Sequence, residues 1–434
     1  MESPQAIAAP TAAGPAGATA RLSVMMFLQF FIWGAWYVTT STFMTEAGMA
    51  TKIGIAYTLC PLAALISPFF LGMVADRFFA SERVLGVLHI LGGVAMFFVP
   101  SAAQVGATPF LLIILAHALF YMPTLGLTNT IAFANMTNPE KQFPLVRVFG
   151  TLGWIVAGML ISFMGVDKTA TPYTLAGGAA VALGLFSFML PHTPPPAKGK
   201  QATIGEVLGV GALSLFRSPS FVVFALASFL ICIPLAAYYA YAGRLVADLG
   251  KPVGGTMSIG QWAEVVFMLL MPLFFARLGV KWMLAVGMLA WVARYALFAV
   301  GAPSSVYWMI VLGIALHGLC YDFFFVTGFI YTDKKAPKEI RGQAQGLLVL
   351  ITQGLGLGLG AFLTGEMFNR IVGGATGAAA LSAYPKFWWI CAGLALIVLI
   401  AFVALFRDDS NDAPAEPRGF EVGSSESESG TAHS

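Results

Sequence analysis

The stretch PHTPPPAKGKQATIGEVLGVGALSLFRSPS, Pro191 to Ser220, is the longest polar interruption in a chain that otherwise alternates long apolar segments with short polar ones. Its prolines and basic residues are typical of a linker outside a membrane. Six apolar segments precede it and six follow it, and each is close to the roughly 20 residues with which a helix crosses a bilayer. The linker therefore divides the chain into two halves with equal numbers of spans.

The composition points to the same class of protein. Of the 434 residues, 58% are hydrophobic and 10% are charged, whereas a soluble domain has about 25% charged residues. We expect an all-α membrane protein. Its twelve transmembrane helices are predicted at about residues 22–45, 54–75, 83–104, 109–136, 144–165, 171–190, 219–246, 256–276, 280–301, 305–332, 342–369 and 385–406.

The distribution of basic residues predicts how the chain is oriented. Of 23 Lys and Arg residues, fifteen fall in the tails or in loops on the side of the tails, six fall on the opposite side and two lie within spans. The positive-inside rule then places both termini in the cytoplasm. The expected organisation is a disordered tail (1–21), a six-helix half (22–191), a cytoplasmic linker (192–218), a second six-helix half (219–406) and a disordered acidic tail (407–434).

A weak internal repeat supports the division into halves. HALFY at His117 to Tyr121 matches HGLCY at His317 to Tyr321, 200 positions later. Two parallel six-helix halves related by pseudo-two-fold symmetry are the arrangement of the major facilitator superfamily, whose substrate site lies between the halves. The loop GMVADRFFASER resembles the G-x-x-x-D-R signature of that superfamily through Gly72, Asp76 and Arg77. We expect a cytoplasmic gate there, with an ordinary solvated turn as the alternative.

Ionisable residues inside the predicted spans are the strongest indication of a site. A charge at mid-bilayer costs a few kcal/mol, so such residues usually face a cavity or a partner. Asp322 lies in the tenth span and Glu264 in the eighth, where Gln261 is on the same helical face. Burial favours the neutral form of a carboxylic acid, so either acid is a candidate for carrying a proton. The alternative is a purely structural pairing with a cation of a neighbouring helix.

Several other classes of function find no support in the sequence. The four cysteines stand singly in apolar segments, without the spacing of a metal site, and we expect neither a metal nor a cofactor. There is no phosphate-binding loop for ATP and no basic run that would suit nucleic acid. We find no combination of nucleophile, base and orienting group that would support catalysis. Secondary transport is the class of function that remains.

Several stretches together resemble the nucleoside:proton symporter family of bacteria. They are FLQFFIWGAW (Phe27 to Trp36), FYMPTLGLTNTI (Phe120 to Ile131), FPLVRVFGTLGW (Phe143 to Trp154), YDFF (Tyr321 to Phe324) and EIRGQAQG (Glu339 to Gly346). The resemblance spans all predicted helices. It implies import of a nucleoside together with a proton, in the bacterial cytoplasmic membrane and as a monomer.

The resemblance also implies site residues. The expected substrate contacts are Arg147, Thr151, Trp154, Gln261, Glu264, His317, Tyr321 and Asp322, with Asp322 and Glu264 in proton coupling. The chain departs from the pattern that the resemblance implies in two places. In the seventh span, Ala237 and Ala240 stand where the family's typical nucleoside permease carries Gln and Asn, and in the tenth span His317 replaces a tyrosine. Two other hypotheses remain open. In one, the same fold transports a sugar or a modified purine nucleoside; in the other, the protein is a membrane sensor that does not transport.

Overall fold

The computed structural model describes residues 17–70, 78–195 and 210–409. These residues are helical throughout, apart from short connections. The α-helices are α1 (Ala18–Tyr37), α2 (Thr40–Glu46), α3 (Ile53–Phe70), α5 (Ser81–Phe97), α6 (Val99–Val105), α7 (Ala107–Ala134), α8 (Pro139–Met164), α9 (Thr171–Ser187), α11 (Pro219–Asp248), α12 (Val253–Gly301), α13 (Tyr307–Ala315), α14 (His317–Cys320), α15 (Thr327–Lys335), α16 (Arg341–Val349), α17 (Leu357–Ile371) and α18 (Gly377–Leu405). The 3₁₀ turns are η1 (Ala50–Lys52), η3 (Val210–Arg217) and η5 (Lys338–Ile340), and the π-helical turns are η4 (Tyr321–Val326) and η6 (Leu350–Gly356).

The helices agree in position with the predicted spans. In the described part of the chain, eight helices are long and apolar enough to cross a membrane, and the bent pair α5 and α6 makes a ninth candidate. One of the eight, α12, covers two predicted spans and is interrupted at Gly279, whose φ of 65° is not helical. The shorter helices α3 and α9 lie where two further spans are predicted. The all-helical membrane architecture is therefore confirmed.

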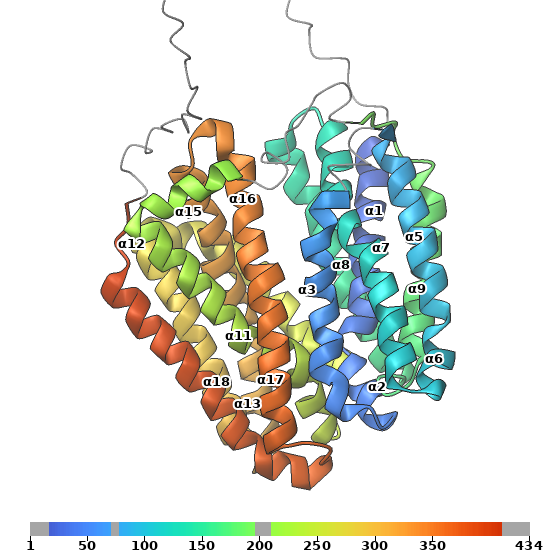
Figure 1. Cartoon of the computed structure of the whole chain (residues 1–434), viewed down its shortest axis with the longest axis vertical. Helices are drawn as coiled ribbons and strands as arrows, with labels where there is room; N and C mark the ends of the chain where they lie inside the picture. Colours follow the sequence, from blue (N-terminus) through green and yellow to red (C-terminus); the bar gives the residue numbers. More distant parts are fainter. Residues whose placement is uncertain (1–16, 71–77, 196–209, 410–434) are drawn as a thin grey trace, which may run out of the picture.

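The helices form two groups, as Figure 1 shows, with α1 to α9 on one side and α11 to α18 on the other. The described chain begins and ends on the upper face of this view, which we call the termini face; the opposite face is the far face. The groups diverge towards the termini face and meet near the far face. The most extensive contacts between the groups are made by α8 with α12 and by α3 with α17, and α3 also touches η6 and α11. The domain boundaries given above remain predictions.

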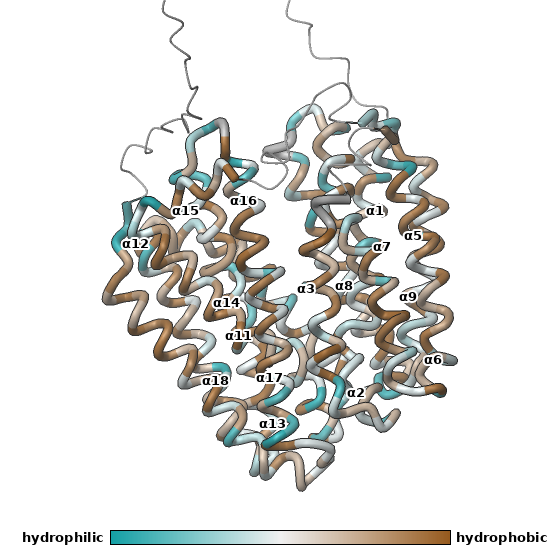
Figure 2. The backbone as a smooth tube through the Cα atoms, viewed as in Figure 1, coloured by the Kyte–Doolittle hydropathy of each residue, from teal (hydrophilic) through white to brown (hydrophobic). Residues whose placement is uncertain are grey.

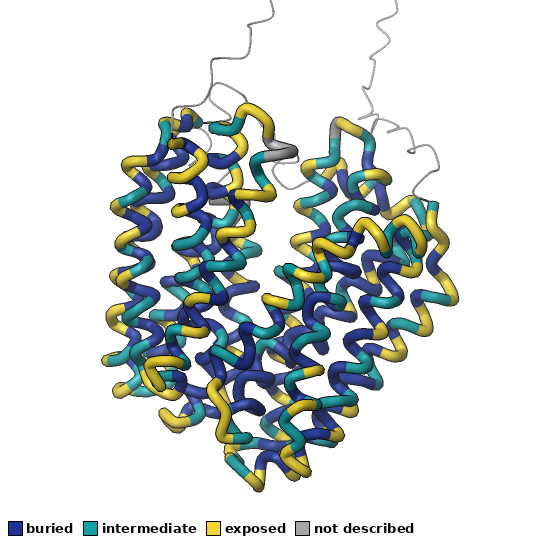
Figure 3. The backbone as a smooth tube through the Cα atoms, turned by 180° about the vertical axis from the view of Figure 1, so that it is seen from behind, coloured by how far each residue is buried: buried dark blue, intermediate teal, exposed yellow. Residues whose placement is uncertain are grey.

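The outer surfaces of both groups suit a lipid environment. Large apolar side chains such as Phe163 and Leu269 are exposed there, and hydrophilic positions concentrate near the two faces rather than along the helices (Figure 2). Seen from behind, exposed positions recur along the outer helices while buried positions fill each group (Figure 3). Because lipid tails replace water around these helices, the exposed apolar residues need no partner within the protein.

Candidate functional site between the two helix groups

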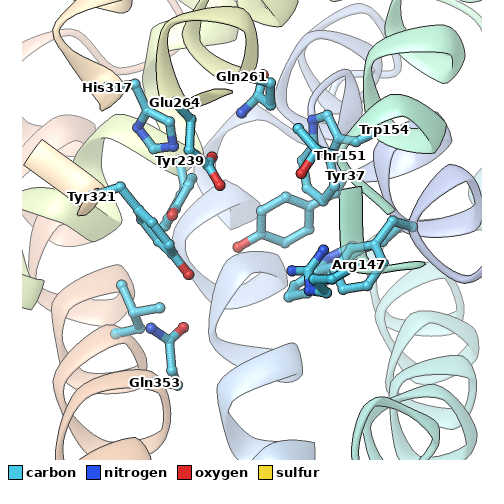
Figure 4. A pocket seen from close by; sticks show the side chains of 13 residues that line it. Tyr37, Arg147, Thr151, Trp154, Tyr239, Gln261, Glu264, His317, Tyr321 and Gln353 are labelled. Carbon is cyan, nitrogen blue, oxygen red and sulfur yellow. The ribbon is translucent and has the colours of Figure 1, made fainter. Parts of the chain in front are cut away.

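A cavity of about 130 Å³ lies between the two groups, lined from both sides. The first group contributes Phe30, Trp33 and Tyr37 from α1 and Arg147, Thr151 and Trp154 from α8; the second contributes Tyr239 from α11, Gln261 and Glu264 from α12, His317 from α14, Tyr321 from η4, Gln353 from η6 and Leu357 from α17. Figure 4 shows the labelled side chains converging on this space. The site therefore depends on both halves of the chain.

The wall formed by α1 and α8 is mainly aromatic. The rings of Trp33 and Trp154 meet edge to face with their centroids 5.6 Å apart, an arrangement that aromatic pairs favour. The two helices approach closely because Gly153 lies against the backbone of Phe27, where a Cβ would clash with the Phe27 carbonyl oxygen. This wall offers flat apolar surfaces on which a planar ring could stack.

Arg147 supplies the positive charge of the same wall. Its Cζ atom lies 4.1 Å from the centroid of the Phe30 ring, a cation–π contact that holds the guanidinium in place. Gly150 leaves the space for this arrangement, since a Cβ there would lie 2.7 Å from the Arg147 Nη1 atom. The guanidinium remains half-buried at the edge of the cavity, where its donors can meet a polar ligand.

The opposite wall carries hydrogen-bonding groups. Gln261 and Glu264 are three residues apart and therefore share one face of α12. His317 lies beside them because α12 and α14 touch through their backbones, with Gly318 against the carbonyl of Ala263. The His317 ring is stacked on Tyr238, centroid to centroid 5.4 Å. An amide, a carboxylate and an imidazole on one wall suit a ligand with several hydroxyl groups.

The structure brings seven of the eight predicted contacts to this cavity. Arg147, Thr151, Trp154, Gln261, Glu264, His317 and Tyr321 all line it. Asp322 does not line it: its side chain is fully buried, and neither carboxylate oxygen has a hydrogen-bond partner in the described part of the chain. Tyr321 and Asp322 are the first two residues of the π-helical turn η4. Neighbouring residues of a helix point in different directions, and of these two only the tyrosine lines the cavity. π-helical turns such as η4 are frequent at functional sites.

Other lining residues were not predicted from the sequence. They are Phe30, Trp33, Tyr37, Tyr239, Gln353 and Leu357. Ala237 and Ala240 are fully buried and do not line the cavity. The polar group that α11 brings to the site is therefore the Tyr239 phenol, rather than the Gln and Asn side chains that the resemblance implies at positions 237 and 240. The aromatic stretch from Phe27 to Tyr37 contained a usable signal, because Phe30, Trp33 and Tyr37 follow helical spacing.

Three further predictions concern other places. Gly72, Asp76 and Arg77 lie outside the described residues, so the gate prediction stays as it was. Within the described ranges, no group of three or more His, Cys, Asp or Glu residues is placed to hold a metal ion. The four cysteines are buried and unpaired with each other. Arg294, for which no role in the site is predicted, is buried in the second group, where its Nε donates to the carbonyl of Gly313 at 3.0 Å.

The chain is similar to known transporters over most of its length. It is 39% identical over 409 residues to the putative nucleoside transporter YegT of Escherichia coli K12, and the match covers 92% of this chain and 96% of that protein. It is 30% identical over 407 residues to the nucleoside permease NupG of the same organism, covering 89% and 95%. These relatives are transporters rather than enzymes, as predicted.

Solved structures agree with the sequence relatives. The crystal structure of the nucleoside transporter NupG matches with a TM-score of 0.80 at 29% identity, over 90% of this chain and 99% of that chain. A D-xylose-proton symporter matches in fold, with a TM-score of 0.70 at 11% identity over 90% and 98%. The fold is therefore that of the major facilitator superfamily, as predicted. Residues 16–411 match the family described as "Nucleoside H+ symporter", and the chain belongs to this family.

Proposed function

We propose that the chain imports nucleosides across the bacterial inner membrane, with protons moving inward alongside them. The observation that carries this proposal is the cavity between the two helix groups, with aromatic rings on one wall and Gln261, Glu264 and His317 on the other. A nucleoside presents the matching chemistry, a flat base and a hydroxylated sugar. A site shared by two halves can release its ligand on either side as the halves rock.

The proposal includes an orientation. If the termini face is cytoplasmic, as the basic residues indicate, the described arrangement has its halves apart on the cytoplasmic side and together on the periplasmic side. A monomer contains every lining residue of the cavity, so the proposed unit of transport is one chain.

Proton coupling is assigned to Asp322, with Glu264 as the second acid. A buried carboxylate without a partner is far less costly when it is neutral than when it is charged. Asp322 is such a group, one residue from the cavity-lining Tyr321. We infer that Asp322 holds a proton while it is enclosed and loses the proton when water reaches it. Glu264 faces the ligand directly, so its charge would depend on occupancy.

Uptake into proteoliposomes tests the proposal. Labelled uridine and inosine are supplied outside, with and without an inward proton gradient, and hexoses are added as competitors. Accumulation that requires the gradient and resists hexoses is expected. Equal uptake without the gradient would contradict coupling, competition by hexoses would favour a sugar carrier, and tight nucleoside binding without any flux would favour a sensor.

A further inference from the structure

Gln353 is a cavity-lining residue to which the sequence patterns assign no role. It is half-buried and lies in the π-helical turn η6, in an otherwise apolar and glycine-rich helix. Its amide group projects into the same space as the predicted contacts (Figure 4). A polar side chain within a membrane span is costly unless it meets a polar group, so its direction calls for an explanation.

The packing of η6 fixes that direction. A Cβ at Gly354 would clash with Leu65 of α3, and a Cβ at Gly356 would lie 2.8 Å from the Cys232 Cβ atom of α11. Successive residues are about 100° apart in an α-helix and less in the wider π-helical turn; with either step, Gln353 lies in the arc between these two contacts. The helix can turn Gln353 away only by driving a glycine position out of its close contact. Gln353 is therefore held towards the cavity.

The polar groups of the cavity lie at two ends. Figure 4 shows Gln261, Glu264 and His317 together at one end, and Gln353 and Arg147 at the other, with Tyr321 between them on the same wall as His317. The first end carries the Glu264 carboxylate, the only acid among the described residues that line the cavity, and a carboxylate accepts hydrogen bonds from hydroxyl groups. The second end has no carboxylate among its described residues and offers the Gln353 amide, with an acceptor and a donor side by side. The first end therefore suits the hydroxylated sugar, and the second suits the edge of a base.

We propose that Gln353 reads the hydrogen-bonding edge of the nucleobase and thereby selects the ligand. This inference rests on the proposed function. The sugar lies against Gln261 and Glu264, the base crosses the aromatic wall, and the Gln353 amide pairs with an adjacent donor and acceptor on the base, as glutamine does with bases elsewhere. Because the amide can turn over, uracil and cytosine edges both fit, while a base alkylated on this edge does not.

Binding of uridine and of N3-methyluridine to the purified protein tests this assignment, since the methyl group removes the N3–H donor. The unaltered protein is expected to bind uridine roughly 10-fold more tightly than the methylated nucleoside. Gln353→Leu is expected to bind both nucleosides equally. Gln345→Leu serves as the matched control, because the Gln345 amide is already bonded to the carbonyl of Phe329 at 2.9 Å and its loss should leave the preference for uridine intact.

Gln353→Glu gives a second, independent readout should the leucine variant fold poorly. A carboxylate accepts but does not donate. The uridine N3–H donor lies between two carbonyl oxygens that would repel the carboxylate, whereas the cytidine amino group has a carbonyl on neither side, so Gln353→Glu should favour cytidine over uridine. Retained discrimination against N3-methyluridine in Gln353→Leu, or an unchanged uridine preference in Gln353→Glu, would overturn the inference while leaving the proposed function in place. Failure of the unaltered protein to bind any nucleoside would instead overturn the proposed function.

Discussion

The far face and the termini face are held together in different ways. At the far face, hydrogen bonds cross between the helix groups: the Asp167 carboxylate accepts from the backbone N–H groups of Val253 and Gly254, at 3.1 and 2.8 Å, and the Asn369 amide donates to the carbonyl of Thr51 at 2.9 Å. Asp167 thus caps the N-terminus of α12 from the other half of the chain.

At the termini face, the comparable clusters stay within one group. In the first, Glu82 accepts from the backbone N–H of Thr193 at 3.0 Å and lies 2.8 Å from the His192 ring. In the second, Asp409 accepts from Ser218, Tyr331 and Lys335. We call the interface between the two helix groups the seam. Hydrogen bonds that cross the seam at the far face, and clusters that stay within one group at the termini face, suit two rigid bodies that pivot at the far face.

The close contact of α8 with α12 should be the most sensitive part of the seam. A Cβ at Gly254 would clash with the backbone of Gly158, and such overpacking costs about 1 to 3 kcal/mol. Gly254→Val should therefore expose far-face positions to water and reduce nucleoside uptake by roughly 5- to 150-fold. Labelling of engineered far-face cysteines by an impermeant reagent measures the opening.

Gly255→Val is the matched control, because a Cβ there would meet only the Ser162 side chain, at 3.6 Å. Equal labelling and equal transport in the two valine variants would show that the seam does not depend on the close glycine contact.

Removing the cap across the seam should have the next largest effect. Loss of an N-cap acceptor costs about 0.5 to 2 kcal/mol, which corresponds to a roughly 2- to 30-fold change in an equilibrium. Asp167→Ala should shift the protein by this factor towards states open at the far face, as measured by spin-label distances across the seam. Asp167→Asn retains an acceptor and should shift the distances less; the reverse order would argue against capping.

The Asp409 cluster should affect stability rather than conformation. Burial raises the pKa of Asp409, but hydrogen bonds from Lys335, Tyr331 and Ser218 outweigh it and hold the pKa below its usual 3.8. A lowered pKa in the folded state stabilises the protein above about pH 4, and this contribution disappears as the pH falls further. Asp409→Asn should lower the Tm by the same amount at pH 8 and at pH 5.5.

The Tm difference between the unaltered protein and Asp409→Asn should then shrink below pH 4. Spin-label distances across the seam should be the same in both proteins. A change in those distances would mean that this cluster takes part in the pivot.

The ion pair between Lys168 and Glu46 should matter least. Its atoms are 2.9 Å apart, but the two side chains are 55% and 51% exposed, and exposed pairs contribute less than about 1 kcal/mol. Lys168→Met should change neither Tm nor uptake measurably. A clear loss of uptake would show that charges at the far face contribute more than solvent screening allows.

The sequence predicts the helices and most of the cavity for identifiable reasons. Hydropathy reveals the spans because side chains that face lipid must be apolar. Helical spacing places Gln261 and Glu264 on one face. The π-helical turns η4 and η6 interrupt the regular helical period, so the sequence pattern does not show that Gln353 lines the cavity while Asp322 does not. The sequence shows that Ala237 and Ala240 cannot supply polar contacts. That Tyr239 supplies a polar group from α11 instead follows only from the orientation of that helix in the structure.

Asp322 offers the most direct test of coupling, because its carboxylate is buried and unpartnered beside the cavity, within the described part of the chain. The measurement compares the unaltered protein with Asp322→Asn in proteoliposomes, for uridine accumulation driven by an inward proton gradient and for exchange of labelled against unlabelled uridine. We predict that the asparagine variant loses accumulation and retains exchange. Full accumulation by Asp322→Asn would contradict the account.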